Sequence, residues 1–278
     1  MVAVMTVMLL SCNDSSSAEP DSKPDDDAGV KVLSHRHCHA LKDLAGDVLG
    51  LEFEQIVFEY TSVGPDLSTP VRLTGSISMH PKVYNKSTQP RAVMPYNQFT
   101  ATKRGDRTSQ DRIDDIGLYM NRYQGLVIVS PDLYGWTLTA DRPQAYCCPE
   151  VIARESVDCW DAAMTVLANQ GYNMSGTLKF NVGYSAGGYS AMAVQRYVDQ
   201  RRTDLSFDFT AAGAAPFDIC TIYRDYVDTD ITGFLAGLPL MVVAYHETYH
   251  LDFSYDEVFQ PPLCDNIEQW ILSKNYTA

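Results

Sequence analysis

The fold is decided by Lys179-Phe180-Asn181-Val182-Gly183-Tyr184-Ser185-Ala186-Gly187-Gly188. The stretch begins with the composition of a buried strand, and the residues that follow it continue as a helix of small side chains. Between them, Gly-x-Ser-x-Gly predicts a sharp strand-to-helix turn that leaves the hydroxyl of Ser185 clear of the sheet. A side chain at Gly183 or Gly187 would meet neighbouring backbone, so the turn requires glycine at both positions.

This turn also suits a negatively charged oxygen. The helix that begins after Ser185 directs backbone N–H groups and the positive end of its dipole toward the hydroxyl. The N–H group of Ala186 is the first candidate to stabilise such an oxyanion. The alternative is a tight turn that happens to contain a serine, but the flanking strand and helix favour Ser185 as a nucleophile.

The composition limits the classes of partner. The 278 residues suffice for one large α/β domain or two small ones, and 45% of them are hydrophobic, which allows a sizeable core. The formal net charge of −14 argues against nucleic acid and against electrostatic docking to an anionic membrane. Part of that charge lies in residues 21–27. We expect no nucleic-acid partner and no cofactor.

The N-terminus resembles the signal of bacterial lipoproteins. Residues 1–12 form an apolar run ending in Leu-Leu-Ser-Cys, similar to the lipobox, whose cysteine, here Cys12, is lipidated and becomes the mature N-terminus. No Lys or Arg precedes the run, so an upstream start or a remnant signal are alternatives, and the run is too short to span a bilayer. The residues after it are mostly Ser, Asp and Pro, so we assign 13–43 to a disordered acidic linker. This predicts an extracytoplasmic protein that is secreted or held at a membrane only by its lipid anchor.

Cysteines and histidines suggest two further features. If the lipobox cysteine is acylated, six cysteines remain, which an exported chain could pair or keep reduced. The vicinal Cys147 and Cys148 are not expected to bond each other. Three alternating histidines would share one side of an extended segment, as metal ligands can: His35, His37 and His39. Because the sequence offers no second cluster of ligands, we expect no metal site.

Most of the chain alternates between strand and helix patterns. Alternating or continuous apolar residues predict strands at 56–62, 71–79, 91–99, 125–132, 178–182 and 207–215. Helical spacing predicts helices at 111–122, 151–170 and 188–198. From about residue 90 onward this alternation predicts an α/β fold with a mostly parallel sheet flanked by helices.

The rhythm changes after residue 216. Residues 216–278 are rich in Tyr, Phe, Leu and acidic side chains and show no clear further β-α-β unit. Residues 237–245 could form a strand or a helix, while 252–259 and 267–273 look like short helices. We expect this segment to form a partial helical cap over Ser185, with an apolar pocket beneath it.

Several motifs, taken in order, resemble the α/β-hydrolase superfamily, and within it the secretory-lipase-like esterases with their lipoprotein members. They span about residues 56–278 and comprise Phe58-Glu59-Tyr60-Thr61-Ser62, Pro70-Val71 with Gly75, Tyr96-Asn97-Gln98-Phe99-Thr100, Val129-Ser130-Pro131-Asp132-Leu133-Tyr134-Gly135, the Gly183–Gly188 turn and Ala214-Ala215-Pro216-Phe217-Asp218. The resemblance implies an α/β-hydrolase core at 44–215, a cap or lid at 216–278, and small-molecule or lipid esters as substrates.

The resemblance also implies roles for individual residues. Ser185 would be the nucleophile, and Ala186 would supply one arm of the oxyanion hole. The other arm would come from the loop after the third strand, here Gln98, where relatives carry a His-Gly or similar pair. Asp132 would be a turn residue that holds a loop, not a catalytic acid.

The acid and base that the serine needs are less evident. In the superfamily they follow the serine in the order acid, then histidine, and the histidines after Ser185 are His246 and His250. In one interpretation Asp218 is the acid, and His246 or His250 is the base. In the other, which the usual length of such enzymes favours, both histidines belong to the cap. The last core strands, with the true acid and base, would then be absent from this chain.

These interpretations lead to three functions. The favoured one is a serine hydrolase that cleaves carboxylic esters through an acyl-enzyme at Ser185, and that is weak or inactive if its acid and base are missing. The second is a non-catalytic surface lipoprotein that binds a ligand on the same fold. The third is a peptidase of that fold.

Overall fold

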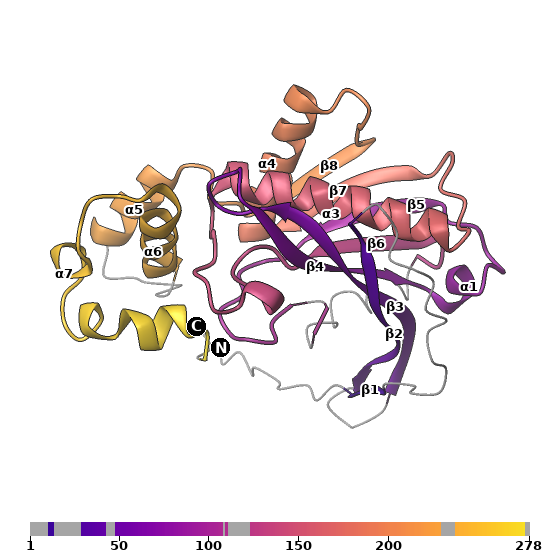
Figure 1. The fold of residues 1–278 in the computed structure, drawn as a ribbon, viewed down its shortest axis with the longest axis horizontal. Helices are drawn as coiled ribbons and strands as arrows, with labels where there is room; N and C mark the ends of the chain where they lie inside the picture. Colours follow the sequence, from indigo (N-terminus) through magenta and orange to yellow (C-terminus); the bar gives the residue numbers. More distant parts are fainter. Residues whose placement is uncertain are drawn as a thin grey trace.

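A computed structural model describes residues 11–13, 29–42, 48–107, 109–110, 123–228 and 237–275. Within them an eight-stranded twisted sheet runs through the molecule, with two long helices lying along it and a group of shorter helices at one end (Figure 1). No helix in these ranges combines the length and the apolar character that crossing a membrane demands. The helix predicted at 111–122 lies outside the described residues.

The sheet is mixed, with an antiparallel and a parallel half. In chain order its strands are β1 Ser11–Asn13, β2 Lys31–Lys42, β3 Val48–Val63, β4 Pro70–Met79, β5 Ala92–Asn97, β6 Leu126–Pro131, β7 Leu178–Tyr184 and β8 Phe209–Gly213. They lie in the order β1-β2-β3-β4-β6-β5-β7-β8. Neighbours are antiparallel as far as β4 and β6, and parallel from β6 through β5 and β7 to β8. The six predicted strands are confirmed as β3 to β8, and the parallel half is the part in which strands alternate with helices.

One boundary prediction is wrong. We expected a disordered linker over 13–43, but Lys31–Lys42 form strand β2, which pairs along its length with β3. The sequence did not indicate this strand because most of its side chains are polar, as befits a position near the edge of the sheet. Among them, His37 Nδ1 lies 2.6 Å from Glu54 Oε1, and His35 contacts Tyr84. Cys38, on the same strand, is fully buried and belongs to a core cluster. No group of three potential metal ligands occurs among the described residues.

The short strand β1 places the backbone of Cys12 in the sheet. Cys12 lies opposite Cys38 in the antiparallel ladder between β1 and β2. Residues 1–10 lie outside the described part of the chain. Lipidation of Cys12 therefore stays a prediction, which the mass of the N-terminal peptide from expressing cells would test.

Two long helices, α3 (Pro149–Asn169) and α4 (Ala186–Arg201), pack side by side on one face of the sheet. Proline stands at the first turn of α3, where its missing N–H is not needed. The helix ends where Gly171 takes φ 76°, and the N–H groups of Gly171 and Tyr172 donate to the carbonyls of Ala168 and Leu167. This is the glycine-terminated C-cap that closes many helices. It confirms the helix predicted at 151–170.

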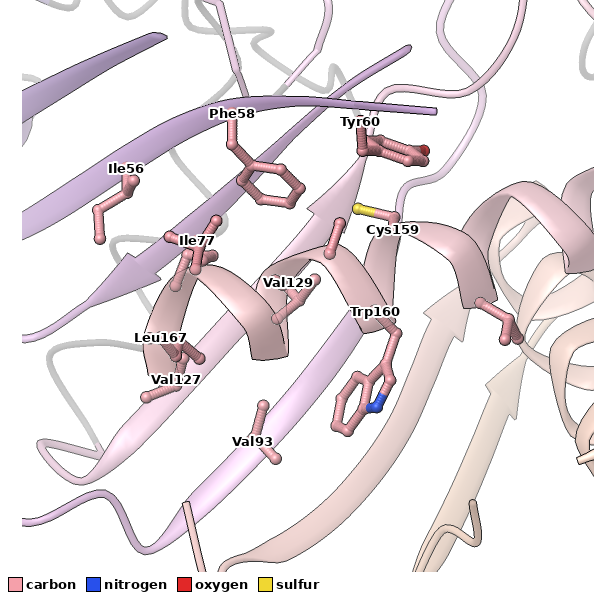
Figure 2. Packing of buried hydrophobic residues seen from close by; sticks show 14 of the residues in the cluster. Ile56, Phe58, Tyr60, Ile77, Val93, Val127, Val129, Cys159, Trp160 and Leu167 are labelled. Carbon is pink, nitrogen blue, oxygen red and sulfur yellow. The ribbon is translucent and has the colours of Figure 1, made fainter. Parts of the chain in front are cut away.

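The core fills the space between α3 and the sheet. Alternate residues of a strand point to opposite faces, so Val127 and Val129 of β6 face α3, while Leu126 and Ile128 belong to a smaller cluster on the other face. This explains why 125–132 is apolar without alternation. Figure 2 shows the α3 face, where Trp160 and its neighbours on α3 lie over the side chains of the strands.

After residue 216 the chain forms the shorter helices at one end of the sheet (Figure 1). They are α5 Ile219–Asp228, α6 Gly237–Tyr249, α7 Tyr255–Val258, η2 Cys264–Asn266 and η3 Glu268–Leu272; α1 Pro81–Tyr84 and η1 Thr137–Thr139 precede them in the chain. The segment left open between strand and helix is thus the helix α6. Ala244 of α6 packs against Cys148 and Val151, and Tyr245 donates from its hydroxyl to the carbonyl of Cys147 at 3.0 Å. These contacts join the short helices to the start of α3.

Candidate active site

The predicted turn lies between β7 and α4, with Ser185 as the residue that joins them. Its backbone has φ 55° and ψ −124°, a combination that non-glycine residues rarely adopt and that costs conformational energy. The N–H of Ser185 donates to the carbonyl of Gly213 at 2.8 Å, and the N–H of Tyr189 donates to the carbonyl of Ser185 at 3.1 Å. These bonds hold the strained turn between β8 and the first turn of the helix.

The glycine requirement is confirmed by the spacing of the backbones. A Cβ atom added at Gly183 would lie 2.0 Å from the carbonyl oxygen of Gly187, and one added at Gly187 would lie 2.1 Å from the carbonyl oxygen of Asn97. Both distances are far shorter than any contact between non-bonded atoms. This turn, Gly183–Gly187, is called the elbow below. It forms only where the backbones of β5, β7 and α4 touch one another.

A buried amide network supports this packing from below. The Nδ2 of Asn97 donates to Asn181 Oδ1 at 2.9 Å and to the carbonyl of Val182 at 3.1 Å. Asn181 in turn donates from its Nδ2 to the carbonyl of Ala191 at 2.7 Å. Both asparagines are buried, so these bonds tie β5, β7 and α4 together directly under the elbow. Sequence reasoning missed this network, although a polar residue inside a buried strand was the available signal.

A cavity of about 40 Å³ adjoins the elbow, and both predicted oxyanion-hole residues line it. Ala186 is the first residue of α4, where backbone N–H groups have no partner within the helix. Gln98 follows β5, and its backbone lies close to Gly187, since an added Cβ there would be 2.9 Å from its carbonyl carbon. The sequence thus identified two residues that the fold brings to one cavity.

The loop after β6 forms a second wall of the site. The carboxylate of Asp132 is fully buried and accepts from the hydroxyls of Thr74 and Ser109. Burial raises the pKa of Asp132, although the nearby guanidinium of Arg107 opposes that effect. The Nε of Arg107 donates to the carbonyl of Asp132 at 2.7 Å, and its guanidinium lies over the ring of Trp136. These contacts agree with Asp132 as a residue that holds a loop.

Glu155 is a buried carboxyl group in the wall of the same cavity that sequence reasoning missed. It is fully buried on α3, where its Oε2 accepts from the N–H of Tyr134 at 2.9 Å. Its Oε1 has no hydrogen-bond partner among the described residues. Burial raises the pKa of Glu155 to about 8. The spacing of four residues from the buried Val151 and to the buried Cys159 could have revealed it, because it places Glu155 on the core face of the helix.

This carboxyl group makes the stability of the protein depend on pH. The folded-state pKa of about 8 lies above the ordinary value of 4.5. A carboxyl group with a raised pKa favours the folded state below its ordinary pKa, and that contribution is lost as pH rises through the folded-state value. Between about pH 5 and about pH 9, we expect the free energy of unfolding to fall relative to that of Glu155→Gln, by up to about 5 kcal/mol.

Urea unfolding at several pH values measures this effect. Glu150→Gln is the matched control, because Glu150 lies on the same helix but is exposed and paired with Arg196. Its unfolding free energy should follow that of the native protein at every pH, with an offset below about 1 kcal/mol. A Glu155→Gln curve parallel to the native curve would show that Glu155 is ionised throughout.

The candidate acid and base have partners within their own segments. Asp218 accepts from the N–H of Thr221 at 2.9 Å and from its hydroxyl at 2.7 Å, bonds that lower its pKa and cap the start of α5. His246 lies on α6, with Nδ1 3.1 Å from Glu247 Oε1 and Nε2 3.0 Å from the carbonyl of Phe253. Among the described residues, no hydrogen bond joins Ser185 to either.

The shorter helices line a second, apolar cavity that is open to solvent. Its volume is about 460 Å³, and it lies between α5, α6 and the segment that follows them, lined mainly by Ile219, Leu238, Met241, Val242, Tyr245 and Phe253. Nearer the elbow, Cys147 and Cys148 are buried free thiols. Burial raises their pKa values to about 12 and about 11.

Comparison with solved structures identifies the fold. The ligand-bound rice cell wall degrading esterase LipA from Xanthomonas oryzae aligns with a TM-score of 0.71 at 20% identity, over 90% of this chain and 68% of LipA. A Legionella pneumophila protein described as a candidate hydrolase aligns with a TM-score of 0.70 at 22% identity, over 82% of this chain and 60% of that protein. Candida antarctica lipase A in its closed state aligns with a TM-score of 0.60 at 14% identity, over 87% of this chain and 54% of the lipase.

These likenesses confirm the predicted fold class and leave the activity open. No protein-family model matches the sequence, and no curated relative was found. The chain spans about three-fifths of the length of the Legionella protein and about two-thirds of LipA.

Proposed function

We propose that this chain, which has the α/β-hydrolase fold, is a serine hydrolase that cleaves carboxylic esters through an acyl-enzyme on Ser185. The observation that carries the proposal is the strained turn at Ser185, with Ala186 and Gln98 lining the cavity beside it. A backbone held at φ 55° is costly for serine, and such strain is concentrated at functional sites. The names of LipA, an esterase, and of the Candida lipase support ester substrates, whether small molecules or lipids.

In the proposed reaction the hydroxyl oxygen of Ser185 attacks the carbonyl carbon of the ester. The carbonyl oxygen becomes an oxyanion that accepts hydrogen bonds from the N–H of Ala186 and from the backbone of Gln98. Collapse of this intermediate releases the alcohol and leaves the acyl group on Ser185. Water then attacks the acyl-enzyme and releases the acid.

This mechanism lacks an evident base for Ser185. A serine hydroxyl needs a base to take its proton, and the base needs a group that orients it. His246 and Asp218 already bond other groups in their own segments. We therefore propose slow turnover by this chain, in which Ser185 attacks without a hydrogen-bonded base and the oxyanion-binding groups lower the barrier.

Covalent labelling tests the proposal. A fluorophosphonate probe should label the folded chain slowly, and mass spectrometry should map the label to the peptide that contains Ser185. p-Nitrophenyl butyrate should be cleaved faster than aminoacyl anilides. A folded chain that takes no label and cleaves no ester would support the non-catalytic binding protein, and preferential cleavage of the anilides would support the peptidase.

A further inference from the structure

The cavity beside the elbow is small and walled on several sides. Its volume of about 40 Å³ compares with the 10 to 15 Å³ that, on the same measure, holds one water molecule, so it accommodates about three non-hydrogen atoms. Tyr134, Trp136 and Tyr146 contribute aromatic surface to its wall. A ligand group that enters it must therefore be short.

The wall of this cavity also contains charged and polar side chains that are buried. Arg107 is 4% exposed, and its guanidinium bonds the carbonyl of Asp132 and lies 3.3 Å from Gln98 Oε1. Glu155 is fully buried, and only its Oε2 has a hydrogen-bond partner among the described residues. A buried polar atom without a partner is costly to the fold. Because Glu155 is one of the residues that line the cavity, a ligand group bound there is the candidate partner for this atom.

Resting on the proposed ester hydrolysis, we propose that this cavity is the acyl subsite and that Glu155 hydrogen-bonds a hydroxyl group on a short acyl chain. The preferred substrates are then esters of hydroxy acids of about two to four carbons. Glu155 is the residue that distinguishes them from plain short-chain esters.

The position of the cavity favours the acyl part of the ester over the alcohol part. Ala186 and Gln98 line the cavity and would hold the carbonyl oxygen, so the group bonded to the carbonyl carbon lies next to it. The acyl group stays attached to Ser185 between the two steps, and an enclosed space can retain it. The alcohol must leave for solvent after the first step.

The chemistry of Glu155 favours a hydroxyl group as its partner. Burial raises its pKa to about 8, so near neutral pH the carboxyl group is largely uncharged and can both donate and accept. A hydroxyl has the same two capacities.

A long acyl chain is too large for this cavity. It does not fit about 40 Å³, whereas the apolar cavity between α5 and α6 has about 460 Å³. Binding measured with short and long esters therefore separates the two cavities. The affinity for decanoate esters should not depend on Glu155.

The test measures binding without catalysis. Calorimetric titration of the Ser185→Ala protein compares ethyl lactate with ethyl propionate, and ethyl 3-hydroxybutyrate with ethyl butyrate. In at least one pair the hydroxy ester should bind about five- to tenfold more tightly, the value of one hydrogen bond. Adding Glu155→Met should remove the preference, while Glu155→Gln, which keeps a donor and an acceptor, should retain most of it. Glu150→Met on the same helix is the control and should leave the preference intact.

Each outcome decides between the claims. Equal affinities within both pairs in the Ser185→Ala protein would overturn the inference and would leave the cavity as a site for buried water only; this comparison does not depend on whether Glu155→Met folds. A preference that survives Glu155→Met would assign the hydroxyl to another residue and would also overturn it. If hydroxy esters bind selectively but Ser185 takes no fluorophosphonate label, the binding inference stands and the proposed hydrolysis fails.

Discussion

Replacing Ser185 with alanine should abolish fluorophosphonate labelling and lower ester hydrolysis at least about 100-fold, because Ser185 supplies the aliphatic hydroxyl of the Gly183–Gly188 turn. The fold should survive. Alanine meets the same backbone strain at φ 55° as serine does, and the serine side chain makes no hydrogen bond that caps α4. The melting temperature of Ser185→Ala should therefore stay close to the native value while the activity is lost.

Two further variants sharpen this result. Ser190→Ala removes the hydroxyl one turn further along α4 and should keep the label. Ser185→Gly should be as inactive as alanine but more stable by about 1 kcal/mol, because glycine adopts φ 55° without strain. Ester hydrolysis that persists in both Ser185 variants would remove Ser185 from the mechanism.

Replacing Gly187 with alanine should unfold the protein or lower its free energy of unfolding by more than about 4 kcal/mol. The added methyl group would lie 2.1 Å from the carbonyl oxygen of Asn97, and that atom belongs to the backbone of a central strand and cannot swing aside. Relief would require β5 and α4 to separate, and α4 is held in place by the neighbouring strand β7 through the bond from Asn181 to the carbonyl of Ala191. Urea unfolding followed by circular dichroism measures the loss.

Gly176→Ala is the control that separates steric overlap from backbone strain. Gly176 has φ 73°, and an added Cβ there meets nothing within 4 Å. Its replacement should cost only the strain of a positive φ, about 1 kcal/mol. If Gly187→Ala is no more destabilising than Gly176→Ala, then the close approach of β5 and α4 is not what holds the elbow.

The fold was predictable where local pattern and burial agree. Residues 125–132 are apolar on both faces because the strand they form, β6, is covered on both, and helical spacing revealed α3 for the same reason. Strand β2 was missed because its stability comes from backbone pairing with β3, while most of its side chains are polar. The segment 237–245 was ambiguous because a short apolar run suits a buried strand and a buried helix equally well.

The site was predictable to the extent that one motif builds it. The turn at Ser185 follows from local sterics, so its glycines and the position of Ala186 were foreseeable. The contribution of Glu155 depends on how α3 approaches the loop after β6, which no local pattern encodes. The buried bond between Asn97 and Asn181 likewise joins residues 84 positions apart in the sequence.

Strand β8 is the last in the order of the sheet, and among the described residues it pairs only with β7. Phe209 on this strand is 59% exposed, and Tyr184 on its neighbour is 64% exposed. Such an edge strand offers unpaired amide and carbonyl groups, together with exposed apolar side chains, to any extended peptide that reaches it. We therefore expect concentrated samples of this chain to form oligomers in which one molecule adds to the next along β8. A lysine introduced on this strand should keep the chain monomeric.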